Sequence, residues 1–356
     1  MARPPRGLIR AAATAAAALL LAGCQLGYFG HLARGQMAVL DARQPIEALV
    51  ADADTDPELR RRLAMVAEAR RFAVTALALP DSDSYRSFVR LERDYVLWNV
   101  FAAPAFSLEP HRWCYLFYGC FAYRGYYDEA LAEGEAERLA ETGLDVHVGG
   151  VPAYSTLGWF DDPLLWSMLY WDDDTLLATV FHELAHERFH LAGDTAFNES
   201  FATFVGSEGL RRWAAARGVD APDTSAGRQR RERFVGLIQE TRDELAALYA
   251  QDDLPADTMR RRKAEIIAAL RARYRALREG PWADFAGYDR WFAEPINNAK
   301  LLPVGLYHRW VPAFRRLFEA ADGDWPAFYR TVEALGALPS DARADVLDAL
   351  LSREAD

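Results

Sequence analysis

The chain has 356 residues, of which 51% are hydrophobic and ten are tryptophan, and its formal net charge is −11. A chain of this size and apolar content can bury a substantial core, as one large domain or as two tightly joined ones. Its acidic balance excludes a nucleic-acid binder, because a phosphate backbone needs a basic surface.

The first 24 residues have the organisation of a secretion signal. A basic start with three arginines precedes an apolar stretch over residues 11–22, which is shorter than the roughly 20 residues that a membrane-spanning helix needs. The stretch ends in Leu-Ala-Gly-Cys, which resembles the bacterial lipobox. This resemblance implies that Cys24 is lipidated and that residues 1–23 are removed as a lipoprotein signal peptide. The alternative is an ordinary signal peptide with a stray cysteine.

The residue after the lipobox bears on the membrane that receives the protein. Gln25 stands where an aspartate would favour retention at the inner membrane. We therefore expect a lipid-anchored protein of the bacterial cell envelope, attached to the outer membrane and facing the periplasm. Removal of residues 1–23 takes away three arginines and no acid, so 38 basic residues face 52 acidic ones and the mature chain carries about −14.

Residues 36–171 predict helices around a small β element. The spacing of apolar residues and the position of turn residues predict two helices over 36–79, a helix over 84–91, a strand over 94–101, a helix over 128–142 and a short strand over 144–150. Cys114 and Cys120 are the only cysteines after Cys24, and an oxidising compartment favours a disulfide between them. Two buried free thiols are the alternative, whereas a metal role lacks the close spacing of zinc knuckles.

The second half of the chain predicts helices almost throughout. Three aspartates at 172–174 offer a helix start, and that helix should continue to Gly193. Long charged segments over 225–250 and 257–277 predict a helical hairpin whose charges form solvated faces. Three further helices are expected over 298–309, 311–321 and 325–335.

The motif that carries chemistry is His182-Glu183-Leu-Ala-His186, because histidines four residues apart lie on one face of a helix and reach the same ion. Glu183 is offset from that face, where it can act as the base for a water on the metal. Glu199 follows 13 residues after His186 in Asn-Glu-Ser-Phe-Ala, which resembles the third-ligand helix of gluzincin metallopeptidases. The resemblance implies a single Zn²⁺ held by His182, His186 and Glu199. The connection between the two motifs is shorter than in most gluzincins.

A wider resemblance covers nearly the whole mature chain. The lipobox, the segment 114–128, the segment 149–161 and Asn297-Asn298-Ala299 resemble a family of predicted bacterial aminopeptidase lipoproteins. The resemblance implies a mainly α (α+β) protein: a zincin-like helical catalytic domain with a small β element lining the cleft. We expect residues 24–356 to form this single domain, with the charged helical hairpin as an insertion at about 225–279.

The expected reaction is hydrolysis of a peptide, in which Glu183 takes a proton from the zinc-bound water as that water attacks the carbonyl. A tyrosine or histidine usually holds the oxyanion, and Tyr307 and Tyr154 are the candidates. For each of them the alternative is a packed aromatic ring. A different class of function is a non-catalytic zinc-containing envelope lipoprotein that acts as an assembly factor or chaperone; the base Glu183 argues against it.

Four more residues are weighed as parts of the site. His190 lies one further turn along the helix, too far for three histidines to meet at one ion. His147 either lines the cleft or is a satisfied histidine of the core or surface. Asp194 is the candidate to support the metal ligands, because Thr203 stands where gluzincins often place an acid. Arg124 either binds a peptide carboxylate or pairs with Asp128.

Overall fold

The computed structural model describes residues 27–352, except for residues 92, 116–118, 155, 157–159, 220–224, 252 and 305–309. Within these ranges the chain is mainly helical with small sheets, which confirms the predicted fold class. None of the helices described there has both the length and the apolar character needed to cross a membrane.

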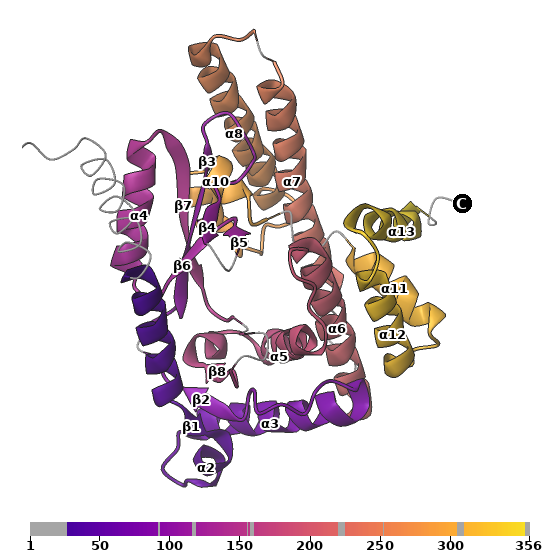
Figure 1. Cartoon of the computed structure of the whole chain (residues 1–356). Coiled ribbons are helices and arrows are strands. Elements are labelled where there is room, and N and C mark those ends of the chain that lie inside the picture. Colours follow the sequence, from indigo (N-terminus) through magenta and orange to yellow (C-terminus); the bar gives the residue numbers. More distant parts are fainter. Residues whose placement is uncertain are drawn as a thin grey trace, which may run out of the picture.

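Helices make up most of the described chain (Figure 1). A first helix covers residues 27–41. The others, in chain order, are α2 (Ile46–Ala51), α3 (Pro57–Leu77), α4 (Glu129–Glu141), the 3₁₀ helix η1 (Trp166–Tyr170), α5 (Asp173–Arg188), α6 (Thr195–Ala216), α7 (Ser225–Tyr249), α8 (Ala256–Arg278), α9 (Asp289–Ala293), α10 (Asn298–Leu301), α11 (Val311–Ala320), α12 (Trp325–Gly336) and α13 (Ser340–Ser352).

Three small sheets lie in the first half of the chain. Their strands are β1 (Gln44–Pro45), β2 (Ser87–Val89), β3 (Leu97–Pro104), β4 (Trp113–Tyr115), β5 (Gly119–Phe121), β6 (Arg124–Tyr126), β7 (Leu144–Val151) and β8 (Leu164–Leu165). The sheets have the orders β1-β2-β8, β6-β3-β7 and β4-β5. In the hairpin β4-β5, Cys114 lies opposite Cys120 and forms a disulfide with an S–S distance of 1.97 Å.

The sheet β6-β3-β7 is covered on both faces because side chains along a strand alternate between them. Trp98, Val100 and Ala102 of β3 pack with α4, which flanks the sheet in Figure 1. The intervening Phe101 and Ala103 pack against the short helix α10 on the other face. The segment after residue 297 therefore packs against a sheet whose last strand, β7, lies about 150 residues earlier in the sequence.

The largest core surrounds α5 and α6. Phe181 and Leu184 of α5 and Phe201 and Phe204 of α6 are fully buried. They pack with α3 on one side and with α11 and α12 on the other, and Figure 1 shows α5 and α6 between these elements. The two helices that carry the predicted metal ligands are therefore held by packing on several sides.

Close contact between α5 and α6 depends on Gly206. A Cβ atom at this position would lie 2.5 Å from the carbonyl oxygen of Ala178 and 3.3 Å from Cβ of His182. Gly236 of α7 is the opposite case, because a Cβ there would meet no atom within 4 Å. Because Gly206 has no side chain, α5 and α6 can approach each other closely beside His182, the first predicted ligand.

We expect Gly206→Ala to lower the free energy of unfolding by about 1–3 kcal/mol, because the new methyl group forces α6 away from α5. Gly236→Ala should raise it by about 0.5–1 kcal/mol, because glycine is unfavourable inside a helix. Urea unfolding of the two variants measures both effects. Equal behaviour of the two variants would show that the interhelical contact at Gly206 is unimportant.

Several predicted helices differ from the structure. The two helices predicted over 36–79 are three, namely the first helix, α2 and α3. The predicted helix over 84–91 is replaced by β2, whose partners β1 and β8 are distant in the chain. The helix that carries the motif ends at Arg188 instead of Gly193, because Phe189 takes an extended conformation. The helix expected over 298–309 ends at Leu301. The hairpin helices α7 and α8 match the predicted segments within about one residue.

Candidate metal centre

The His-Glu-x-x-His motif lies in the last two turns of α5. The Asp172 side chain accepts a hydrogen bond from the Thr175 amide and caps the start of this helix. His182 and His186 are one turn apart, and their Nε2 atoms lie 3.1 Å from each other. Two ring nitrogens that face one point suit a shared metal ion.

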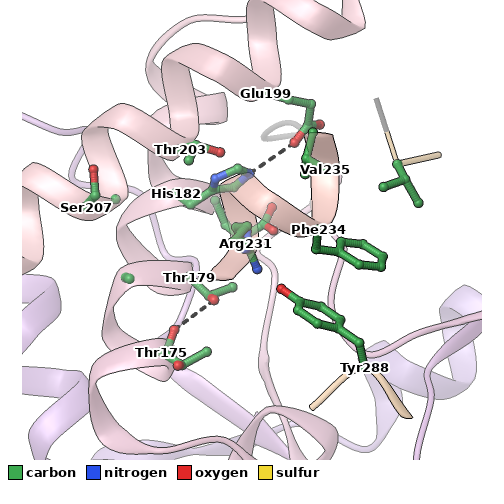
Figure 2. A pocket seen from close by; sticks show the side chains of 14 residues that line it. Thr175, Thr179, His182, Glu199, Thr203, Ser207, Arg231, Phe234, Val235 and Tyr288 are labelled. Carbon is green, nitrogen blue, oxygen red and sulfur yellow. Dashed lines mark hydrogen bonds and ion pairs between the residues drawn. The ribbon is translucent and has the colours of Figure 1, made fainter. Parts of the chain in front are cut away.

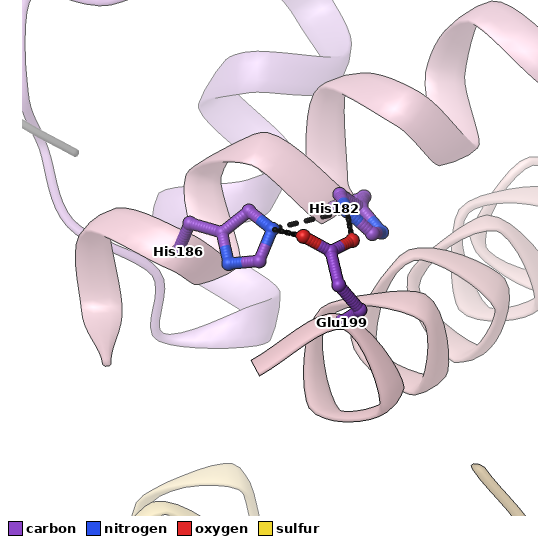
Figure 3. Close-up of side chains that lie close together, drawn as sticks. All are labelled: His182, His186 and Glu199. Carbon is purple, nitrogen blue, oxygen red and sulfur yellow. Dashed lines mark hydrogen bonds and ion pairs between the residues drawn. The ribbon is translucent and has the colours of Figure 1, made fainter. Parts of the chain in front are cut away.

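Glu199 of α6 completes the cluster (Figure 3). Its Oε2 lies 3.3 Å from Nε2 of His182, and its Oε1 lies 3.6 Å from Nε2 of His186. One carboxylate oxygen faces each imidazole, and one ligand atom from each of the three residues lies within 4.8 Å of the others, so the group can hold a metal ion. Two imidazoles and one carboxylate are also a donor set that zinc takes in catalytic sites. The structure thus brings together the three residues that the sequence predicts as ligands.

The protonation of the two histidines is set by burial and by their neighbours. Desolvation, and then the charge of His182, lower the pKa of His186 to about 3. Desolvation also acts to lower the pKa of His182, but the hydrogen bond with Glu199 and the charge of Glu183 outweigh it, so the pKa is raised. At least one imidazole is therefore neutral at ordinary pH, the form in which histidine binds a metal.

Glu183 lies beside the cluster without belonging to it. Desolvation is the main cause that raises its pKa to about 7, and the charge of Glu199 acts in the same direction, while His182 opposes them. Its side chain lines the cavity that also contains His182 and Glu199. This is the arrangement that a base needs: it faces the space next to the metal ligands and does not coordinate the ion itself.

The short turn between α5 and α6 is fixed by hydrogen bonds. The Leu191 amide donates to Oδ1 of Asn198, and Nδ2 of Asn198 donates to the Leu191 carbonyl, both at 2.8 Å. Gly193 has a φ of +84°, which glycine adopts without strain. Asp194 accepts from the Phe197 amide and pairs with Arg343 at 2.6 Å. Asp194 therefore supports the start of α6 and not, as its place in the sequence suggests, the metal ligands directly.

A cavity of about 600 Å³ opens beside the cluster (Figure 2). Helices α5, α6 and α7 and the segment after α8 form its walls. The described residues that line it are Thr175, Ala178, Thr179, His182, Glu183, Glu199, Thr203, Gly206, Ser207, Arg231, Phe234, Val235, Tyr288 and Val304. None of them belongs to the sheet β6-β3-β7, so the expectation that the β element lines the cleft does not hold for this cavity.

Only one of the two tyrosines expected to hold the oxyanion lies among the described residues. Tyr307 lies outside the described residues, as does Cys24. The Tyr154 hydroxyl donates to Oε1 of Gln36 at 2.8 Å and accepts from the Tyr127 hydroxyl at 3.2 Å. It does not line the cavity, so the structure does not bring Tyr154 into the site.

A further tyrosine is electrostatically coupled to a clustered ligand. Desolvation and then the charge of Glu199 raise the pKa of Tyr123, although 42% of its surface is exposed. Tyr123 follows the disulfide hairpin β4-β5, and its ring centroid lies 5.7 Å from that of Phe101. The sequence does not predict this coupling, since nothing in the local pattern distinguishes Tyr123 from the other tyrosines of this segment.

The remaining candidates are not among the clustered ligands. His190 follows the end of α5, and its ring centroid lies 6.4 Å from that of His186. Arg124 pairs with Glu135 at 3.3 Å and lies over the ring of Tyr28, rather than pairing with Asp128. His147 of β7 stacks on Phe101 with ring centroids 6.3 Å apart.

We expect His147 to make stability depend on pH. Desolvation and then Lys300 lower its pKa to about 4, and Glu294 opposes them. This folded-state pKa lies below the usual value of about 6.5. Between pH 6.5 and about pH 4, the unfolded chain therefore binds a proton at His147 that the folded chain does not bind. The free energy of unfolding decreases as the pH falls through this range. From pH 7 to 4.5 the loss should be about 2–3 kcal/mol.

Urea unfolding of wild type and His147→Gln at pH 7 and 4.5 measures this contribution. The variant should lose about 2–3 kcal/mol less than wild type over the same range. All other titrating groups are common to both proteins, so their effects cancel in the comparison. Parallel losses in the two proteins would contradict the burial of a neutral histidine at this position.

The chain matches no curated protein and no solved structure. A family model described as "Putative aminopeptidase" matches residues 27–347, which include α5, α6 and all three clustered ligands. A match over this length shows the family: the chain belongs to the "Putative aminopeptidase" family.

Proposed function

We propose that the protein is a zinc-dependent peptidase, and in particular an aminopeptidase. The observation that carries the proposal is the convergence of His182, His186 and Glu199 into a group that can hold a metal ion, with Glu183 beside them on a cavity wall. Membership of the "Putative aminopeptidase" family supports a peptidase activity. A purely structural zinc site would have no use for a base next to an open cavity.

In this proposal each residue has a separate task. His182, His186 and Glu199 would hold the ion, which would act as a Lewis acid and make water a better nucleophile. Glu183 accepts the proton of the attacking water and later gives it to the leaving amine. Its buried carboxylate is suited to both steps because burial brings its pKa to about 7.

We also propose that the protein is anchored at the periplasmic side of the bacterial membrane through Cys24. The support is the lipobox-like sequence ahead of Cys24. The Cys24→Ser variant tests it: the wild type should fractionate with membranes and label with a radioactive fatty acid, and the variant should do neither. Unchanged fractionation and labelling of the variant would contradict the anchor.

The test of the peptidase proposal uses a soluble form that begins at Gln25. Metal content is measured, and hydrolysis is followed on aminoacyl substrates and on internally quenched peptides with free and blocked N-termini. We expect one zinc per chain and cleavage of free N-termini only. Cleavage of blocked peptides would make the enzyme an endopeptidase. Zinc without any cleavage would favour a non-catalytic envelope protein, and absence of zinc would disprove the site.

A further inference from the structure

The cavity beside the metal ligands extends along α5 and α6. On α5 its lining residues run back from His182 to Thr175, and on α6 they run forward from Glu199 to Ser207. Both runs lead away from the ligands in the same direction, because Gly206 packs against α5 one turn before His182. At about 1.5 Å per residue, the far end of the cavity lies about 10 Å from the ligands.

Beyond the ligands and Glu183, the described lining residues of α5 and α6 are all small, being Thr, Ala, Gly or Ser. Most of their hydroxyl groups already donate hydrogen bonds within the helices. The Thr179 hydroxyl donates to the Thr175 carbonyl at 2.9 Å (Figure 2), and the Thr175 hydroxyl donates to Asp172 at 2.9 Å. The Ser207 hydroxyl donates to the Phe204 carbonyl at 2.9 Å. This side of the cavity therefore offers space and few hydrogen-bond donors.

The side of the cavity formed by α7 and the segments after α8 and α10 is largely apolar. Phe234 and Val235 of α7, the ring of Tyr288, and Val304 lie there. The rings of Phe234 and Tyr288 stack with centroids 4.1 Å apart and an angle of 6° between them. Phe234 is also buried in the core between α7, α8 and α9, so this side is held in place. Figure 2 shows the two rings beside the helices that carry the ligands.

The charged residues of the lining do not make this space a site for a charged side chain. Glu183 and Glu199 belong to the proposed catalytic centre, and Arg231 interacts with other groups of the protein. A charged or polar side chain would lose water here without gaining a matching partner, which costs free energy. An apolar side chain would instead be removed from water. This preference concerns the substrate side chain and places no condition on the α-ammonium group of a peptide.

We propose that the cavity binds a large apolar side chain, such as that of Leu or Phe, from a substrate residue next to the scissile bond. Thr179 lies on one side of this side chain, and Phe234 and Val235 lie on the other. A volume of about 600 Å³ has room for it. The inference rests on the proposed peptidase function and names its substrate class. It gives α7 of the charged hairpin a role in specificity.

The test compares peptides that carry Ala, Leu, Phe, Glu or Lys, first as the residue before the scissile bond and then as the residue after it. At one of the two positions, wild type should cleave the Leu and Phe peptides with a kcat/KM on the order of tenfold to a hundredfold above the Ala peptide. Glu and Lys should not exceed Ala at that position. Equal values for Ala, Leu and Phe at both positions would overturn the inference.

Variants connect the preference to the cavity. Thr179→Leu places a larger side chain in the space beside His182, so the ratio of kcat/KM for Phe over Ala should fall severalfold or more. Val235→Asp should lower the same ratio, because it puts a charge where the apolar side chain binds. A ratio within one preparation does not depend on the fraction of active protein. An unchanged ratio in Thr179→Leu would contradict the assignment.

Thr331→Leu is the matched control. The Thr331 hydroxyl donates to the carbonyl of Ala327, four residues earlier on α12, at 3.2 Å, as that of Thr179 donates to Thr175 on α5. Thr331 does not line the cavity. The exchange therefore changes the same local hydrogen bond without filling the cavity, and the preference for Phe over Ala should persist. An equal loss of preference in Thr331→Leu would show that the cavity is not its cause.

Binding measurements keep this inference distinguishable from the peptidase proposal. The same peptides are titrated calorimetrically into zinc-loaded Glu183→Gln, with and without Thr179→Leu. Tighter binding of the Phe peptide than of the Ala peptide, lost in Thr179→Leu, would support the inference even if wild type cleaved nothing. Equal affinities for the Ala, Leu and Phe peptides would overturn it, even if wild type cleaved all of them and the peptidase proposal stood.

Discussion

Glu183→Gln should lower kcat by about 10²–10⁴-fold and leave the zinc content at one ion per chain. The amide has nearly the shape of the carboxylate but cannot accept a proton from water. Because Glu183 lies next to His182 in sequence yet is not among the clustered ligands, its replacement removes the base without removing a metal ligand. Steady-state kinetics and metal analysis on the same preparation measure both quantities.

Glu187→Gln is the matched control for this prediction. Glu187 lies one turn after Glu183 on α5 and is partly buried, but it does not line the cavity. Its replacement should change kcat by less than about threefold. An equal loss of activity in both variants would indicate that the negative charge of α5 controls the rate, rather than proton transfer by Glu183. Full activity of Glu183→Gln would disprove the mechanism.

The sequence predicts those parts of the fold that depend on local pattern. The long periodic segments become α4, α7, α8, α11 and α12 at nearly the expected residues, because amphipathic helices record their buried face in their own spacing. The short strand β2 was predicted as helix because its conformation is imposed by distant partners, β1 and β8. The C-terminal helix α13 was not predicted at all.

The residues of the site show the same distinction between what local pattern predicts and what contacts between distant segments determine. The cluster of His182, His186 and Glu199 could be predicted because two of its members are one helical turn apart and the third follows after a short turn. Arg231 and Tyr288 could not be predicted as cavity residues, since they come from α7 and from the segment after α8. Only the packing of those segments against α5 and α6 places them near the ligands.

The third ligand provides the most discriminating test of the metal centre. Glu199 is positioned by the fixed turn before α6, through Asn198 and through the Asp194–Arg343 pair, so contacts of the fold itself hold it close to the histidines. Glu199→Ala removes one of three protein ligands. Zinc affinity should therefore fall by more than the 10- to 100-fold that loss of an outer hydrogen-bond partner typically costs.

Thermal unfolding with and without zinc measures this loss independently of activity. An ion present at about a hundred times its Kd adds about 2.7 kcal/mol to the stability of the folded state, so wild type should melt a few degrees higher with zinc. Glu199→Ala should lose this increase. Glu208→Gln is the control on the same helix, because it breaks ion pairs with Arg211 and Arg212 at 2.6 and 3.1 Å. Its Tm should be lower than that of wild type both with and without zinc. Zinc should still raise the Tm of this variant. A zinc-dependent increase that survives in Glu199→Ala would show that the third ligand comes from elsewhere in the chain.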